Sequence, residues 1–102
     1  MAEQKHQWTY AENLYCVEVA FENFVVKKYT AMFNPVVEEI YRNFNGQIKR
    51  ASIVMKLQNI KALLTEYHID NTLTLRELEN VSSDNRKAFL VVLEKYQNLI
   101  DR

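Results

Sequence analysis

Apolar residues recur at intervals of three and four along most of the chain, the spacing that places side chains on one face of an α-helix. The clearest case is residues 53–67, where the apolar positions step by four, three, four and three. The chain has one glycine and one proline, too few for the tight turns that join β-strands. The pattern therefore predicts an all-α fold, a compact bundle of four to five helices joined by polar connections.

The first helix is predicted to begin at a capping box. Thr9 and Glu12 stand three residues apart, so the hydroxyl and the carboxylate can each accept a hydrogen bond from a backbone N–H at the helix start. The apolar positions that follow predict a helix from about Tyr10 to Lys28. They form a stripe that we expect to be buried, namely Leu14, Val17, Phe21, Phe24, Val25 and Tyr29.

Two further helices are predicted in the centre of the chain. Asn34 followed by Pro35 is typical of a helix start, because asparagine caps well and proline in the first turn gives up an N–H that has no partner there. This second helix is expected to end at Gly46 in a left-handed conformation. Ser52 is then expected to cap a third helix over residues 53–67. Its core-facing stripe is Ile53, Leu57, Ile60, Leu64 and Tyr67.

The last third of the chain is predicted to hold one long helix, preceded by a single turn. Thr74 and Glu77 have the capping-box spacing for that turn. Ser83 or Asp84 is expected to cap the final helix, which extends to about Leu99. Within the bundle, the first three helices are expected to form a trihelical, helix-turn-helix-like centre.

The totals fit a single domain that spans residues 1–102. Apolar residues make up 48% and charged residues 25% of the chain, as expected of a protein that buries one core. The single cysteine, Cys16, cannot form an internal disulfide, and no secretory pattern opens the chain, so we expect a cytoplasmic protein. No apolar run approaches the roughly 20 residues of a membrane-spanning helix, so no membrane partner is expected.

The charge is distributed unevenly, although its total is zero. Residues 27–61, here called the basic region, hold seven basic and two acidic residues, a local charge of +5, and the rest of the chain carries −5. A zero total argues against a protein that coats nucleic acid, because such proteins carry a basic excess. The uneven distribution nevertheless predicts one positive and one negative face.

The third helix supplies the residues that we predict to bind nucleic acid. Lys56 and Asn59 are expected to be neighbours on its surface, and Leu63 is also expected to lie off the core stripe. Lys49 and Arg50 precede the helix, where exposed N–H groups and the helix dipole attract phosphate. Asparagine can pair with adenine, and lysine with guanine, in the major groove. The predicted nucleic-acid-binding residues are Lys49, Arg50, Ser52, Lys56, Gln58 and Asn59. The alternative is that the polar side chains of this helix form only a solvated face.

Two short stretches resemble known families. The opening of the first helix, with Trp8, Thr9 and Glu12, is similar to the start of Myb/SANT-type trihelical domains. The stretch "SIVMKLQNI", which begins at Ser52, resembles a pattern in amino-terminal modules of bacterial HNH-type endonucleases and other mobile-element proteins. The later aromatic residues of a Myb repeat are not found at its spacing. The resemblance implies a recognition or docking module without a cutting domain.

No group of residues has the spacing of a catalytic or metal site. His6 and His68 lie far apart in sequence and, with Cys16, give no pair at metal-ligand spacing. Cys16 stands among apolar helix positions, where we expect a small buried filler. A single glycine cannot build a phosphate-binding loop. We therefore expect no enzyme activity, no metal and no cofactor.

Three functions are compatible with these residues. The leading hypothesis is a non-catalytic module that binds DNA, RNA or a nucleic-acid-bound protein such as a nuclease through basic residues around 49–61. Because the net charge is zero, a monomer would bind modestly, and a homodimer or a partner protein would supply the rest. The alternative is a phage- or plasmid-encoded inhibitor of a host nuclease, of the anti-CRISPR type, that acts by protein contact. Its contact residues would be Glu12, Glu18 and Glu22, or Glu77, Glu79 and Asp84. The third hypothesis is a helical dimerisation or adaptor module.

Overall fold

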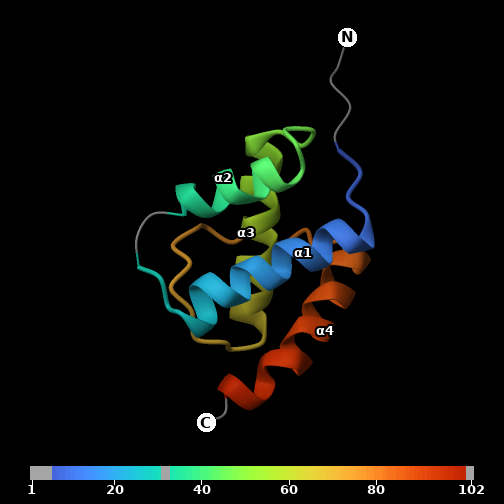
Figure 1. Cartoon of the computed structure of the whole chain (residues 1–102). Coiled ribbons are helices and arrows are strands. Elements are labelled where there is room, and N and C mark those ends of the chain that lie inside the picture. The colour runs from blue at the N-terminus through green and yellow to red at the C-terminus, as the bar shows by residue number, and fades with distance from the viewer. Residues whose placement is uncertain (1–5, 31–32, 101–102) are drawn as a thin grey trace.

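Four α-helices and one π-helical turn account for the regular structure of the residues that the structure describes (Figure 1). The computed structural model describes residues 6–30 and 33–100. The elements are α1 (Tyr10–Ala20), η1 (Phe21–Val26), α2 (Asn34–Asn43), α3 (Arg50–Glu66) and α4 (Ser83–Ile100). The described residues contain no β-strand, so the all-α prediction is confirmed, with the helix count at the low end of the predicted range.

Helix α1 passes across α3 and packs along α4 (Figure 1). Helix α2 packs against α3 and also contacts α1. Residues 69–82, here called the crossing segment, lead from the region after α3 to α4 without regular structure. A helix-turn-helix arrangement of the central helices stays a prediction. Among the described helices, none is long and apolar enough to span a membrane.

The first helix begins at the predicted capping box. The N–H of Glu12 donates to Thr9 Oγ1 at 3.1 Å, and the N–H of Thr9 donates to Glu12 Oε1 at 2.9 Å. The helix then widens into η1 and ends before Lys28, whose φ is +50°. Tyr29 therefore lies outside the helix and is 41% exposed, so its predicted place in the buried stripe was wrong.

Helix α2 differs from its prediction at its start and agrees at its end. It begins at Asn34 itself, with Phe33 in the capping position and no side-chain hydrogen bond at this cap, so the predicted asparagine cap was wrong. Pro35 lies in the first turn as expected. The left-handed glycine is confirmed, since Gly46 has a φ of +70° and its N–H donates to the carbonyl of Tyr41 at 3.0 Å.

Helix α3 begins at Arg50, before the predicted Ser52 cap, which was wrong. Lys49 holds the capping position, and its carbonyl already accepts a hydrogen bond from the N–H of Ile53 at 3.1 Å. Ile48, directly before the cap, is buried in the core. Because Ile48 is fixed in the core, the helix begins at Arg50, and Ser52 lies inside the first turn.

The crossing segment is held to the bundle by its side chains. Leu73 is buried in the core. The predicted turn at Thr74 does not form, and the carboxylate of Glu77 instead accepts a hydrogen bond from Thr65 Oγ1 of α3 at 3.0 Å. The segment therefore contacts α3 without forming a helical turn of its own.

Helix α4 is capped one residue earlier than predicted. The Oγ of Ser82 accepts a hydrogen bond from the N–H of Asn85 at 3.2 Å, and its carbonyl accepts one from the N–H of Arg86 at 3.1 Å. The capping hydroxyl is therefore that of Ser82, and the predicted choice of Ser83 or Asp84 was wrong.

The core lies where α1, η1, α3 and α4 meet. The rings of Phe21 and Phe89 join η1 to α4 with centroids 5.3 Å apart. Cys16 is buried, as expected of a small filler. Leu63 is fully buried, so its predicted position off the core stripe was wrong. The buried polar residues are Asn13, Lys56 and Asn85.

Candidate functional site

The residues predicted to bind nucleic acid do not share one open face. Lys49 and Arg50 are exposed at the start of α3. Arg50 Nε donates to both carboxylate oxygens of Glu38, at 2.6 and 3.0 Å, and the guanidinium lies 3.9 Å from the ring centre of Tyr41. The hydrogen bond from Arg50 holds the pKa of Glu38 below its usual value. The ionised carboxylate therefore compensates the charge of Arg50 within the protein.

Gln58 and Asn59 lie beneath the crossing segment. Asn59 Nδ2 donates to the carbonyl of Leu78 at 2.6 Å, and the N–H of Leu78 donates to the carbonyl of Gln58 at 3.2 Å. Both side chains are half-buried. The amide that we predicted to read a base thus fastens the crossing segment to α3.

Two lysines of the basic region also contact the crossing segment. Lys28 Nζ lies 2.6 Å from Asp70 Oδ2, and Lys61 Nζ donates to Asn71 Oδ1 at 2.9 Å. The pKa of Asp70 is lowered by the hydrogen bond from Lys28, so this carboxylate is also ionised at neutral pH. These contacts bring negative and polar groups against the basic region, so much of the charge segregation seen in the sequence is lost in the fold.

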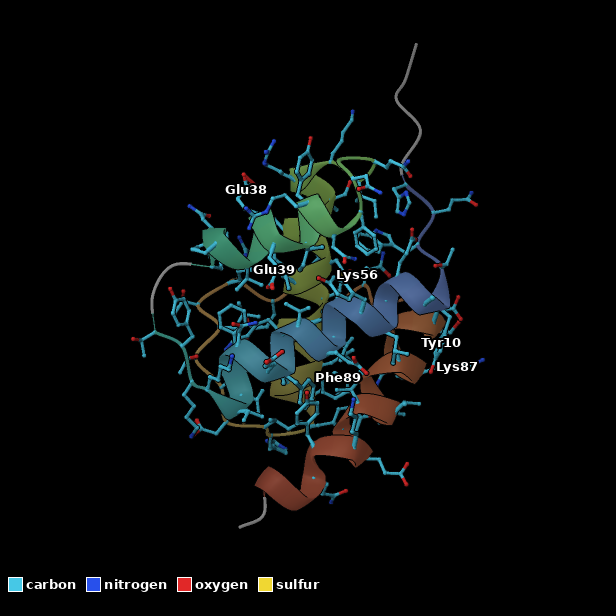
Figure 2. The ribbon with its side chains drawn as sticks, viewed as in Figure 1. Tyr10, Glu38, Glu39, Lys56, Lys87 and Phe89 are labelled. Atoms are coloured by element: carbon cyan, nitrogen blue, oxygen red, sulfur yellow. The ribbon has the colours of Figure 1, made fainter. Side chains whose placement is uncertain are left out.

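Lys56 is buried, contrary to the expectation that it lies on the surface. Figure 2 shows it where α1 passes across α3. Its ammonium lies 5.0 Å from the centre of the Trp8 ring, which in turn packs edge-on against Phe44. Trp8 comes from the segment before α1, far from Lys56 in sequence, so the helical pattern of α3 alone could not indicate this burial.

The surroundings of Lys56 leave its charge weakly compensated. Removal from water lowers the pKa of Lys56, and the fields of Cys16 and Asp84 oppose this only in part. Burial raises the pKa of the Cys16 thiol to about 12, so the thiol is protonated and uncharged at neutral pH. Asp84 is therefore the anionic group of this pair that acts on Lys56.

A small open cavity of about 180 Å³ adjoins Lys56, and we call it the Lys56 pocket. Three of the predicted residues, Ser52, Lys56 and Asn59, meet in its wall. The remaining wall residues are His6, Trp8 and Met55. The pocket therefore combines a cation and a hydroxyl with apolar and aromatic surface.

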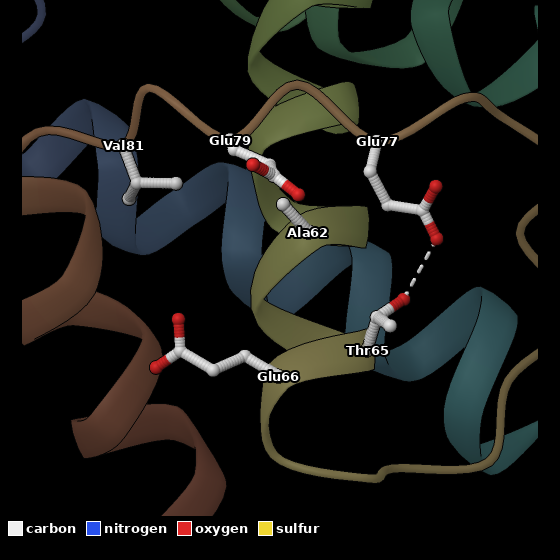
Figure 3. A pocket seen from close by; sticks show the side chains of 6 residues that line it. All are labelled: Ala62, Thr65, Glu66, Glu77, Glu79 and Val81. Atoms are coloured by element: carbon white, nitrogen blue, oxygen red, sulfur yellow. Dashed lines mark hydrogen bonds between the residues drawn. The ribbon is translucent and has the colours of Figure 1, made fainter.

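A second, larger cavity of about 630 Å³ lies between α3 and the crossing segment (Figure 3). We call it the acidic groove, because three of its six wall residues are carboxylates. Glu66 extends from α3, and Glu77 and Glu79 extend from the crossing segment. Its other wall residues are Ala62, Thr65 and Val81.

The contacts of the groove carboxylates keep at least two of them ionised. The pKa of Glu77 is lowered by the hydrogen bond from its own backbone N–H and by the hydroxyl of Thr65. The hydrogen bond from Arg86 lowers the pKa of Glu66, which pairs with that guanidinium at 3.1 Å. Glu79 is exposed beside them. Because Arg86 compensates the charge of Glu66, the net negative charge of the groove is carried by Glu77 and Glu79.

Sequence reasoning found part of these two sites. Glu77 and Glu79 were predicted as a protein-contact group, whereas their third predicted member, Asp84, is not in the groove wall and Glu66 takes that place. A carboxylate in the last turn of the third helix, facing the acidic stretch that follows it, is the feature that could have indicated Glu66. Trp8 was expected near the first helix, and its contact with Lys56 was missed.

Comparison of the chain with protein-family models, curated proteins and solved structures finds no match. Within residues 6–30 and 33–100, no three His, Cys, Asp or Glu side chains are grouped so that they could hold a metal ion.

Proposed function

We propose that this protein is a non-catalytic binding module that docks a basic segment of a partner protein in the acidic groove. The observation that carries the proposal is that Glu66, Glu77 and Glu79 line one open groove that also has apolar surface. Arginine and lysine side chains have the matching chemistry, because their aliphatic stems pack on apolar surface while their charged heads pair with carboxylates.

The charge around the groove supports a basic partner. Residues 66–84 contain five acidic residues and one basic residue, and two of the five carboxylates are paired with basic residues outside this stretch, Asp70 with Lys28 and Glu66 with Arg86. A groove with this charge repels phosphate and raises the encounter rate with positively charged surfaces. The basic channel of a nuclease is a surface of the required sign. An inhibitor that acts by contact with a host nuclease is therefore one form of this proposal. In that form, the basic partner is the nuclease.

The nucleic-acid hypothesis has less support from the described contacts. Lys56 is buried, Asn59 is bonded to the crossing segment, and Arg50 is paired with Glu38. The hypothesis stays a prediction, and the experiment that tests the acidic groove also tests it.

The test is a titration of the whole chain into a fluorescently labelled arginine-rich peptide and, in parallel, a labelled DNA duplex. We expect the peptide to bind and its affinity to fall between about 50 and 200 mM salt, because salt screens exposed charges. The double variant Glu77→Gln/Glu79→Gln is expected to weaken peptide binding by about tenfold, equivalent to about 1.4 kcal/mol. Glutamine keeps an acceptor oxygen for Thr65, so the crossing segment should stay in place.

The matched control is Glu94→Gln, which removes a negative charge from an exposed position on α4 outside the groove. This variant is expected to bind the peptide almost as well as the unmodified protein. Equal loss in the groove variant and the control would contradict the proposal, as would salt-sensitive duplex binding in the absence of peptide binding. That second outcome would support the nucleic-acid hypothesis.

A further inference from the structure

Lys56 is a buried cation without a close anionic partner. The residue is 5% exposed, and within the described residues its ammonium makes no hydrogen bond or ion pair. The face of Trp8, at 5.0 Å, is its nearest favourable contact. An ammonium removed from water is costly unless it is paired and hydrogen-bonded, and a π-face supplies only a small part of what water provides.

The groups around Lys56 leave its N–H donors available. An ammonium has three donors and no acceptor. Asp84 acts on the ammonium only through its field, and Cys16 is uncharged because its pKa is raised to about 12 by burial. An acceptor that enters the Lys56 pocket would meet an ammonium with its hydrogen-bonding capacity unused.

The size and lining of the Lys56 pocket restrict what can enter it. Its volume of about 180 Å³ is below the range of about 300–1,000 Å³ that is typical of pockets for drug-sized ligands. Ser52 supplies a hydroxyl in the wall, while Trp8 and Met55 supply apolar surface. The Nε2 of His6 is already engaged by Glu12 at 2.9 Å. The pocket therefore has room for one small charged group on a short apolar stem.

We propose that the Lys56 pocket binds a singly charged carboxylate on a small aliphatic stem. The carboxylate would accept hydrogen bonds from Lys56 Nζ and Ser52 Oγ, and the stem would pack against Trp8 and Met55. One carboxylate charge matches the single ammonium in the wall. A phosphate group carries up to two charges at neutral pH, and the negative field of Asp84 disfavours it. The site is separate from the acidic groove and does not rest on the function proposed for that groove.

Trp8 makes the proposal directly measurable, because it is the only tryptophan of the chain and its ring forms part of the pocket wall. The whole chain is titrated with propionate, acetate and inorganic phosphate at constant ionic strength while Trp8 fluorescence is recorded. We expect a saturable change with propionate and a dissociation constant of about 1–10 mM, as for a ligand of few atoms. Acetate is expected to bind more weakly because its stem is shorter, and phosphate is expected to bind least.

The decisive variant is Lys56→Met, which keeps an unbranched side chain one heavy atom shorter than lysine and removes the charge. It is expected to weaken propionate binding by about tenfold or more. The control Lys87→Met removes a lysine charge from the surface of α4, away from the pocket (Figure 2), and is expected to leave binding unchanged. Circular dichroism shows whether each variant is folded. If Lys56→Met does not fold, Ser52→Ala takes its place, with an expected loss of about fivefold, equivalent to about 1 kcal/mol, for one hydrogen bond.

Three results would overturn the proposal. They are the absence of a saturable change with propionate up to about 100 mM, equal binding of phosphate and propionate, and undiminished binding of propionate by Lys56→Met.

A second experiment identifies the source of the carboxylate. It compares propionate with a short blocked peptide that contains one glutamate, and with the same peptide containing glutamine. Tighter binding of the glutamate peptide than of propionate, lost in the glutamine peptide, assigns the carboxylate to a protein segment. Weaker binding of the glutamate peptide than of propionate assigns it to a free small acid.

Discussion

Asn59 and Leu78 join the middle of α3 to the crossing segment through a hydrogen bond of 2.6 Å, in which Asn59 Nδ2 donates to the Leu78 carbonyl. Glu77 and Glu79 stand on either side of Leu78 in sequence and line the acidic groove. The bond therefore fixes the backbone between the two groove carboxylates. An amide that was predicted to contact nucleic acid has a structural role in positioning the groove.

Replacing Asn59 should loosen the crossing segment. Asn59→Ala removes the bond to Leu78 and leaves a half-buried carbonyl without this donor, so we expect a loss of about 1–2 kcal/mol in the free energy of unfolding. Urea denaturation measures the loss, and hydrogen exchange should show faster exchange at residues 77–81. Asn80→Ala, at an exposed position, is the control and should change neither quantity. Unchanged stability and exchange in Asn59→Ala would show that the bond does not hold the segment.

Removing the charge of Lys56 should stabilise the protein or leave its stability unchanged. A buried charge with weak compensation costs more than an unbranched apolar side chain of similar size, so we expect Lys56→Met to raise the free energy of unfolding by about 0–2 kcal/mol. Thermal and urea denaturation at neutral pH measure this difference. A large loss in Lys56→Met, together with retained stability in Lys87→Met, would show that the ammonium contributes to stability.

The same pair of proteins should differ in its response to pH. Burial holds the pKa of folded Lys56 below its ordinary value of 10.5, with Cys16 and Asp84 opposing the shift. Between the lowered folded pKa and 10.5, the unfolded chain binds the proton and the folded chain does not, so rising pH favours the folded state. The stability of the unmodified protein should therefore rise relative to Lys56→Met as the pH approaches 10.5 from below. A constant difference between the two proteins over this range would contradict the lowered pKa.

Cys16 should be unreactive in the folded protein. It is fully buried, and the rise of its pKa to about 12 leaves almost no thiolate, the reactive form, at pH 8. We expect a thiol reagent such as DTNB to label the native protein at least about 100-fold more slowly than the urea-unfolded protein. The free thiol of cysteine in solution serves as the reference. Similar rates in the two states would place Cys16 at the surface.

Gly46 should resist substitution because of its backbone conformation. Its φ is +70°, and an added Cβ would lie 3.2 Å from the hydroxyl oxygen of Tyr41. Gly46→Ala is therefore expected to lower the free energy of unfolding by about 1–2 kcal/mol, measured by urea denaturation. The neighbouring Asn45 also has a positive φ, +54°, so Asn45→Gly should be tolerated with a smaller change. Equal effects of the two substitutions would contradict this explanation.

Local features of the sequence predicted local structure, and contacts between distant segments decided the rest. The Thr9–Glu12 capping box and the left-handed Gly46 each depend on a few adjacent residues, and both were confirmed. The burial of Lys56 depends on Trp8, which is distant in sequence, and the covering of Asn59 depends on Leu78. A helical pattern contains no information about which segment will cover a given face. For that reason the core stripe of α3 was mostly correct, while its predicted open face was covered.

A map of amide chemical-shift changes in the ¹⁵N-labelled chain, recorded as the arginine-rich peptide is added, would show directly whether the peptide binds in the acidic groove. We expect saturable shifts in residues 62–66 and 77–81, on the two sides of the acidic groove, and their loss in Glu77→Gln/Glu79→Gln. Shifts confined to the start of α3 around Lys49 and Arg50, or saturable shifts with duplex DNA and none with the peptide, would contradict this expectation.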